Sequence, residues 1–263
     1  MDLTKIHIIP EMDELDEYIE LANKYGLHFE YNDFYMPWIL DNEDRKTEII
    51  DTYLKKAGEL PSDNSLHGAF LDVTIFSMDE KIRTISEFRI RQSMDIASRI
   101  GAKSVIIHTN YVPTFLDDDY ENSWVDKNYK FLTKLLKDYP DINIYMENMF
   151  DITPDMLARL AERLKDYSNF GVCLDYAHLN VFGSKNISPK EWVNKLAPYI
   201  KHVHINDNDK LKDRHWALGK GSIDYGEFLD YYNKNFPEAT VLIEVKGIDK
   251  IRESLNYLIE KSN

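Results

Sequence analysis

Nine acidic and histidine side chains stand where they could bind a divalent cation. Six of them come at the ends of short apolar runs of strand length. The other three follow closely, one of them three residues after an aspartate and two in the segment KDRHWALGKGS. Imidazole nitrogens and carboxylate oxygens are common ligands of divalent metals in proteins. The set is His67, His108, Glu147, Asp175, His178, His204, Asp213, His215 and Glu244.

Gathering these nine groups at one place would be costly without a counter-charge. The burial of several carboxylates and imidazoles carries a large desolvation penalty, which a cation offsets. We therefore expect a bound divalent metal, and more than one ion is possible. Because the ligands offer oxygen and nitrogen but no thiolate, they suit Mn²⁺, Mg²⁺, Co²⁺, Fe²⁺ or Zn²⁺, and the sequence does not choose among these metals.

Other side chains near the same positions leave alternatives open. His202 and His204 are two residues apart and share one face of a strand, so one could bind the metal while the other supports it. His204 is the preferred ligand because it lies nearer the strand's end. Glu30 ends an apolar run and could contact substrate, with a structural ion pair as the alternative. The substrate-binding candidates are His178, Phe70, Trp216 and Glu30.

Eight short runs rich in apolar and β-branched residues predict the strands that would position these groups. The runs are residues 5–9, 27–31, 65–70, 104–109, 142–147, 171–175, 201–206 and 240–245. Segments with helical spacing of apolar residues lie between them. These are residues 13–25, 43–57, 79–100, 123–139, 224–235 and 249–261, with two further helices that begin at Thr153-Pro154 and Ser188-Pro189. The acidic run 117–121 is expected to be a solvated loop.

A strand followed by a helix, eight times in this length, is typical of an α/β protein with a (β/α)₈ TIM barrel. An open doubly wound sheet is the alternative, but no GxGxxG follows the first strand, which disfavours a dinucleotide fold. Composition does not shift along the chain, so residues 1–263 are expected to form a single domain. Side chains at the carboxyl ends of the barrel strands would then meet at one mouth.

Composition and charge exclude several classes of protein. The chain has 32 basic and 46 acidic residues, for a formal net charge of −14, which argues against a non-specific binder of nucleic acid or anionic membranes. It does not exclude a local basic or metal-lined site, so nucleic acid remains an open partner. A single cysteine, no signal-like start and no long apolar run predict a cytoplasmic protein without a membrane span. A homo-oligomer is compatible with the sequence.

Several stretches resemble the xylose isomerase-like TIM-barrel superfamily, which contains sugar and sugar-phosphate isomerases and epimerases together with endonuclease IV. The similar stretches are LHGAF, AKSVIIHTNYVP, NIYMENM, GVCLDYAHLN, HVHINDND, DRHWALGKGSIDY and VLIEVKG. In the isomerase and epimerase branch one metal is held by four side chains, and the resemblance implies Glu147, Asp175, His204 and Glu244 here. It also implies that Glu147 and Glu244 transfer the proton, through a metal-stabilised enediolate.

The endonuclease IV branch supplies the alternative. Its trinuclear zinc site resembles the full set of nine residues, which would then act on a phosphodiester. This sequence departs from that branch in two places. Only eight residues separate His204 from Asp213, fewer than in the endonuclease, and Phe70 stands where the endonuclease has a tyrosine close to DNA. The preferred function is thus a metal-dependent isomerase or epimerase with a small carbohydrate substrate, and a metal-loaded barrel without catalysis is a third alternative.

Overall fold

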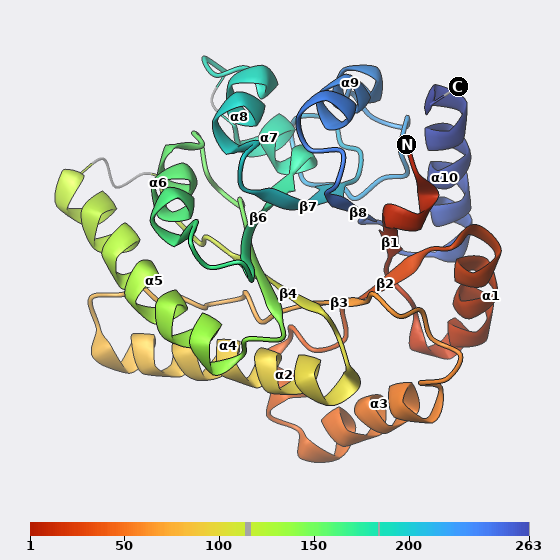
Figure 1. Cartoon of the computed structure of the whole chain (residues 1–263), viewed down its shortest axis with the longest axis horizontal. Coiled ribbons are helices and arrows are strands. Elements are labelled where there is room, and N and C mark those ends of the chain that lie inside the picture. Colours follow the sequence, from red (N-terminus) through yellow and green to blue (C-terminus); the bar gives the residue numbers. More distant parts are fainter. Residues whose placement is uncertain (114–116, 184, 263) are drawn as a thin grey trace.

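Eight parallel strands form a closed barrel in the computed structural model, which describes residues 1–113, 117–183 and 185–262 (Figure 1). Each strand pairs with the next, and the last pairs with the first. The strands are β1 (Ile6–Ile8), β2 (His28–Tyr31), β3 (Ser65–His67), β4 (Ser104–His108), β5 (Asn143–Glu147), β6 (Phe170–Asp175), β7 (Ile200–Ile205) and β8 (Thr240–Ile243). Every strand overlaps a predicted run, so the predicted TIM barrel is confirmed.

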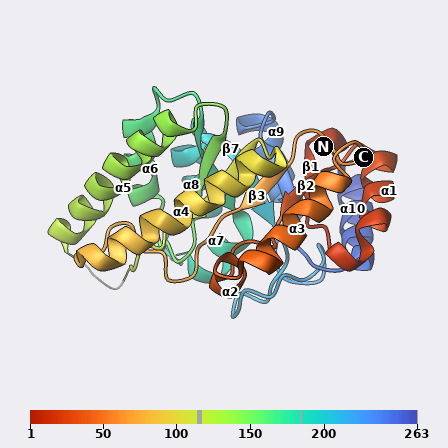
Figure 2. The ribbon, with the colours of Figure 1, turned by 90° about the horizontal axis from the view of Figure 1, so that it is seen from below.

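Helices surround the barrel, and all eight predicted helices are present (Figures 1 and 2). They are α1 (Leu15–Tyr25), α3 (Glu43–Lys55), α4 (Glu80–Ile100), α5 (Asp118–Asp138), α6 (Asp155–Leu164), α8 (Pro189–Leu196), α9 (Tyr225–Asn235) and α10 (Ile248–Ser262). Local sequence explains several ends. Gly101 stops α4 in the left-handed region with a φ of 77°, and Ser188 forms a capping box with Glu191 at the start of α8.

The structure corrects three details of the helix prediction. The acidic run expected to be a loop instead begins α5, where Asp117 caps the helix by accepting a hydrogen bond from the Tyr120 amide. Acidic residues in a first turn also interact favourably with the helix dipole. Two short helices, α2 (Pro37–Leu40) and α7 (Tyr176–Phe182), were not predicted, because segments of this length carry little periodicity. The α7 helix carries His178, one of the nine predicted ligands.

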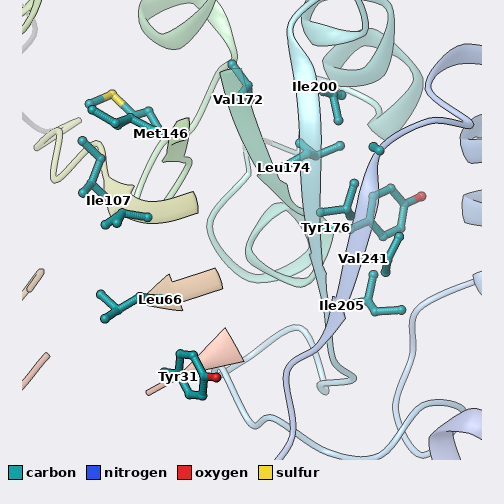
Figure 3. Packing of buried hydrophobic residues seen from close by; sticks show 14 of the residues in the cluster. Tyr31, Leu66, Ile107, Met146, Val172, Leu174, Tyr176, Ile200, Ile205 and Val241 are labelled. Atoms are coloured by element: carbon teal, nitrogen blue, oxygen red, sulfur yellow. The ribbon is translucent and has the colours of Figure 1, made fainter. Parts of the chain in front are cut away.

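The strands divide their side chains between two environments, as the pleat requires. One set faces the helices and is apolar (Figure 3). Its members include Tyr31, Leu66, Ile107, Met146, Leu174, Ile205 and Val241. The intervening positions face the barrel interior and are largely polar although they are buried, including His7, Glu30, Ser65, His67, His108, Glu147, Asp175, His202 and His204. Barrel interiors of this type are usually filled by branched apolar residues, so the polar interior points to a function.

The two termini lie on the same side of the barrel as α10 in both views (Figures 1 and 2). This placement follows from the pairing of β1 with β8. Among the described residues, no helix is long and apolar enough to cross a membrane.

Candidate metal centre

Glu147, the last residue of β5, lies at the centre of the inward-facing cluster. One of its carboxylate oxygens is 3.1 Å from His108 Nε2 and 3.4 Å from His204 Nδ1. The other oxygen is 3.5 Å from His178 Nδ1, and His67 Nε2 lies 3.8 Å from the first oxygen. Four histidines from β3, β4, α7 and β7 therefore enclose one carboxylate that has no exposed surface.

Two groups of potential ligand atoms share Glu147. The first contains His67, His108 and Glu147, and the second contains Glu147, Asp175 and His204. Within each group the ligand atoms lie within 4.8 Å of one another, close enough to contact a common ion. In the described part of the chain, both oxygens of Glu147, Asp175 Oδ2 and His204 Nδ1 are buried without a hydrogen-bond partner. Such orphaned polar atoms are costly, and a divalent cation in each group would satisfy them, so these residues fit a metal.

Glu244, Asp213 and His215 border the same cluster. Glu244 Oε2, just beyond the end of β8, is 3.8 Å from His204 Nδ1 and 3.6 Å from His215 Nδ1. One oxygen of Asp213 lies 2.8 Å from His215 Nε2 and 3.4 Å from His178 Nε2. The fold thus brings together all nine residues that the sequence singled out.

The loop between β7 and α9 holds Asp213 and His215 in place. Asp207 and Trp216 exchange two backbone hydrogen bonds of 2.9 Å, which close the loop into an antiparallel bridge. His215 has a φ of 47°, in the left-handed region that residues other than glycine seldom adopt. Backbone strain of this kind is concentrated at functional sites, where the surrounding structure maintains it.

The charges of the cluster depend on one another. Burial by itself would raise the pKa of Glu147, but His108 and His204 outweigh it and hold that pKa well below its ordinary value. Burial raises the pKa of Asp175 to about 8, although His178 opposes the shift. For His215, burial is outweighed by Glu244 and Asp213, which raise its pKa to about 10. Without a metal, protons therefore compensate the carboxylates at neutral pH.

A cavity of about 410 Å³ opens onto this cluster. Six of the nine predicted ligands form part of its wall: His67, His108, His178, Asp213, His215 and Glu244. Phe70 also lines the cavity, as predicted, and its ring stacks on His108 with the centroids 4.5 Å apart. A cavity of this size suits a small molecule.

Two predicted substrate-binding residues lie elsewhere. Trp216 is 37% exposed and lines a separate hollow beside Lys220. Glu30 is fully buried inside the barrel, where its carboxylate contacts His202 and His204 at 3.2 and 3.3 Å. The structural ion pair, which was the alternative for Glu30, is therefore present. A contact of either residue with substrate stays a prediction.

Sequence reasoning missed seven residues of the cavity wall: Ile9, Asn32, Tyr35, Met149, Arg214, Lys246 and Lys250. Tyr35 stacks on Phe70 with the ring centroids 5.3 Å apart. The three basic residues could have been noticed, since Arg214 lies between Asp213 and His215 and both lysines follow Glu244 within six residues. Tyr35 gave no local signal because its loop after β2 contacts the mouth only in the folded chain.

Known proteins resemble the chain in both sequence and structure. A profile described as "Xylose isomerase-like TIM barrel" matches residues 12–261. An uncharacterized protein of Methanocaldococcus jannaschii is 30% identical over 206 residues, which cover 74% of this chain and 68% of the relative. A probable endonuclease 4 of Mycobacterium ulcerans is 30% identical over 179 residues, 64% of this chain and 67% of that protein.

A solved D-tagatose 3-epimerase-like protein superposes with a TM-score of 0.73 at 25% identity, covering 97% of this chain and 96% of that one. The barrel topology, the inward-facing ligand cluster and the match over almost the whole length agree with one another. The chain belongs to the xylose isomerase-like TIM barrel family.

Proposed function

We propose that the chain is a divalent-metal-dependent isomerase or epimerase of a small carbohydrate, which moves a proton at a carbon next to a carbonyl group. The observation that carries this proposal is the position of Glu244. Its carboxylate borders both the ligand group around His204 and a cavity of about 410 Å³. A base beside an electrophilic site in a cavity for a small molecule is the arrangement that such proton transfer needs.

The residues divide the reaction between them. A cation held by Glu147, Asp175, His204 and Glu244 would stabilise the negative charge that develops on the substrate oxygens as the proton leaves. Glu244 lines the cavity, so we assign proton removal to it. Glu147 enters from β5, across the mouth from β8, and we assign to it the return of the proton on the other face of the substrate.

The superposed epimerase-like structure supports this proposal, and the acidity of the chain suits a sugar better than a nucleic acid. His178, in the cavity wall, would bind substrate oxygens, and Phe70 would cover an apolar face of the sugar.

Hydrolysis of a phosphodiester is the second candidate, and one observation favours it. Glu147 is shared by two ligand groups and enclosed by histidines, an arrangement that suits a bridging ligand between two zinc ions. His178, Asp213 and His215 would form a third group. Arg214, Lys246 and Lys250 in the cavity wall would offset the charge of a phosphate. The similarity to a probable endonuclease 4 points the same way.

Three measurements separate the candidates. The metal-loaded protein is incubated in D₂O with a panel of ketoses and their phosphates, and deuterium at the carbon next to the carbonyl is followed by NMR. In parallel, the protein is incubated with duplex DNA that contains an abasic site, and metal bound per chain is measured by elemental analysis. We expect deuterium exchange with one ion of manganese or cobalt per chain. Incision of the DNA with two to three zinc ions and no exchange would replace the first candidate by the second.

A further inference from the structure

A second polar cluster lies inside the barrel, one layer of side chains below the metal centre. Glu30 projects from β2, and His202 and His204 project toward it from β7, three strands away around the closed barrel. Glu30 Oε1 is 3.3 Å from His204 Nε2, and Oε2 is 3.2 Å from His202 Nε2. None of the three side chains lines the cavity, and all three are fully buried. One carboxylate therefore bridges two histidines in the buried interior of the barrel.

The two ring nitrogens of His204 face different groups. Nδ1 points to Glu147 at 3.4 Å and to Glu244 at 3.8 Å, whereas Nε2 points to Glu30. A neutral imidazole has one N–H and one lone pair, and only the nitrogen with the lone pair can bind a metal. The contact with Glu30 is at ion-pair distance without the alignment of a hydrogen bond. Glu147 attracts a hydrogen on Nδ1 from a similar distance, so Glu30 alone does not decide the tautomer. A cation bound at Nδ1 would take that lone pair, and the attraction of Glu30 would then stabilise the remaining hydrogen on Nε2.

The surroundings hold the Glu30 carboxylate in this position. Ser65, its partner in the register between β2 and β3, donates a hydrogen bond of 2.8 Å to Oε2. His202 Nδ1 lies 2.6 Å from the Thr240 hydroxyl, so both ring nitrogens of His202 already face polar partners. Tyr145 stacks on the His202 ring with the planes 17° apart. His202 thus supports Glu30, and it also forms a group of potential ligand atoms with Cys173 and His204, within 4.8 Å of one another.

We propose that Glu30 is a positioning residue of the metal centre, which holds His204 from below with its hydrogen on Nε2 and presents Nδ1 to the cation. Carboxylates that contact the outer nitrogen of a metal-binding histidine fix its tautomer and increase its basicity. The inference rests on the metal-binding part of the proposed function. It goes beyond that function because it assigns to Glu30 a role that acts through His204, and Glu30 does not line the cavity.

The wild-type protein allows a first test that needs no variant of Glu30. Protein labelled with ¹⁵N-histidine is loaded with Zn²⁺, and two-bond ¹H–¹⁵N correlations report which nitrogen carries the hydrogen. The His204 signals are assigned from their loss in His204→Gln. We expect zinc on Nδ1 and the hydrogen on Nε2. Zinc on Nε2, with the hydrogen on Nδ1, would overturn the inference.

A second test measures metal affinity in Glu30→Gln, with Asp33→Asn as the matched control. Asp33 follows β2 closely and its carboxylate accepts a hydrogen bond of 2.6 Å from Tyr53, on α3. Metal-free proteins are titrated with Zn²⁺ against a competing chelator. The binding step to compare is zinc binding at the ligand group that contains His204, and it is recognised as the step that the variant Asp175→Asn lacks. We expect Glu30→Gln to weaken this step by about 10- to 100-fold and Asp33→Asn to leave it unchanged.

The outcomes separate the inference from the function on which it rests. Equal zinc affinity in Glu30→Gln and the wild type would overturn the role of Glu30, while deuterium exchange by the wild type would leave the proposed function standing. A wild-type chain that binds no zinc, manganese or cobalt would overturn both. If Glu30→Gln does not fold, the tautomer of His204 in the wild type decides the matter.

Discussion

Two glutamates at the mouth of the barrel have the same chemistry but different surroundings. Glu147 is fully buried and its oxygens contact imidazoles, whereas the side chain of Glu244 keeps about 10% of its surface exposed in the cavity wall. A buried, shared carboxylate is suited to hold metal, and a carboxylate in a cavity wall is suited to contact substrate. The same change to glutamine should therefore have different effects at the two positions.

Glu244→Gln should lower the rate of deuterium exchange into substrate by at least about 100-fold, because it removes the base and one of the four proposed metal ligands. Glu147→Gln should abolish exchange and also reduce the metal bound per chain, because both ligand groups contain this carboxylate. Exchange rates, elemental analysis and thermal unfolding would be compared with Glu20→Gln, a change on the outer surface of α1. Wild-type exchange in either site variant would contradict the proposed mechanism.

A buried acid beside the mouth should make stability depend on pH. Asp151 accepts hydrogen bonds from the Thr109 hydroxyl and the Met149 amide, and burial raises its pKa to about 6 from an ordinary value of 3.8. The stability that results from protonating Asp151 is fully present below about pH 4 and is lost as the pH rises through 6. Asparagine does not titrate, so Asp151→Asn avoids this loss. The free energy of unfolding of the variant, relative to that of the wild type, should therefore rise between pH 4.5 and 7.5, by about 3 kcal/mol at most.

Urea unfolding of both proteins at pH 4.5, 5.5, 6.5 and 7.5 would measure this difference. A difference that stays constant over the range would show that Asp151 titrates normally in the folded chain.

Among the elements, β7 shows how a small irregularity determines the site. Its register against β6 shifts between Val172 and Cys173, so that Val172 pairs with Ile200 and Cys173 pairs with His202. Lys201 is the extra residue. Because side chains alternate along a strand, one extra residue reverses the faces of those that follow. The shift lets Ile200 pack outside while His202 and His204 both point into the barrel.

The conformation of the loop after β7 depends on Gly221, which packs closely against the start of the same loop at Asp207 and Asn208. A Cβ atom added at Gly221 would lie 2.3 Å from Asn208 O and 2.3 Å from Asp207 Oδ1, much closer than atoms can approach. Gly221→Ala should therefore displace the loop that carries Asp213 and His215. We expect a loss of about 1–3 kcal/mol in the free energy of unfolding and less zinc bound per chain.

Gly58→Ala is the matched control, because a Cβ atom there would have no heavy atom within 4 Å in the part of the chain that the structure describes. It should change the free energy of unfolding by less than about 0.5 kcal/mol. Thermal unfolding and zinc titration of both variants provide the measurement. Unchanged stability and unchanged zinc binding in Gly221→Ala would show that the loop can rearrange freely.

At the scale of the whole molecule, the barrel concentrates acidity at one mouth. Four carboxylates, those of Glu147, Asp175, Asp213 and Glu244, meet there in a chain whose net charge is −14. The metal-free cluster retains protons, since the pKa of Asp175 is raised to about 8 and that of His215 to about 10. A metal must displace these protons in order to bind.

Zinc should therefore bind with release of protons and with an affinity that increases from pH 6 to pH 8. Calorimetry in two buffers of different ionisation enthalpy would count the protons. At 100 times its dissociation constant, zinc should stabilise the fold by about 2.7 kcal/mol, and a chelator should reverse this gain. Binding without proton release, or a melting temperature insensitive to the chelator, would contradict a metal centre at the mouth.

Much of the fold could be predicted because its signals are local. The eight strands are short apolar runs, and starts and stops such as Ser188 and Gly101 act within a turn of the helix. The prediction failed where the local signal was ambiguous: acidic residues suit both a loop and a helix start, as at Asp117, and α7 is too short for periodicity. Six of the nine candidate ligands could be proposed because strands that share a direction end at the same mouth, and His178, Asp213 and His215 follow these ends closely in the sequence.

The sequence by itself determined the order of the elements and the chemical types of the groups that meet, since both depend on residue identity and short spacing. The tertiary structure decided which nitrogen of His204 faces which carboxylate and that Glu30 lies beneath the cluster. It also decided that Glu147 is enclosed while Glu244 borders the cavity. These relations depend on barrel closure and strand register, which bring distant residues within a few ångströms, and no local pattern encodes such distances.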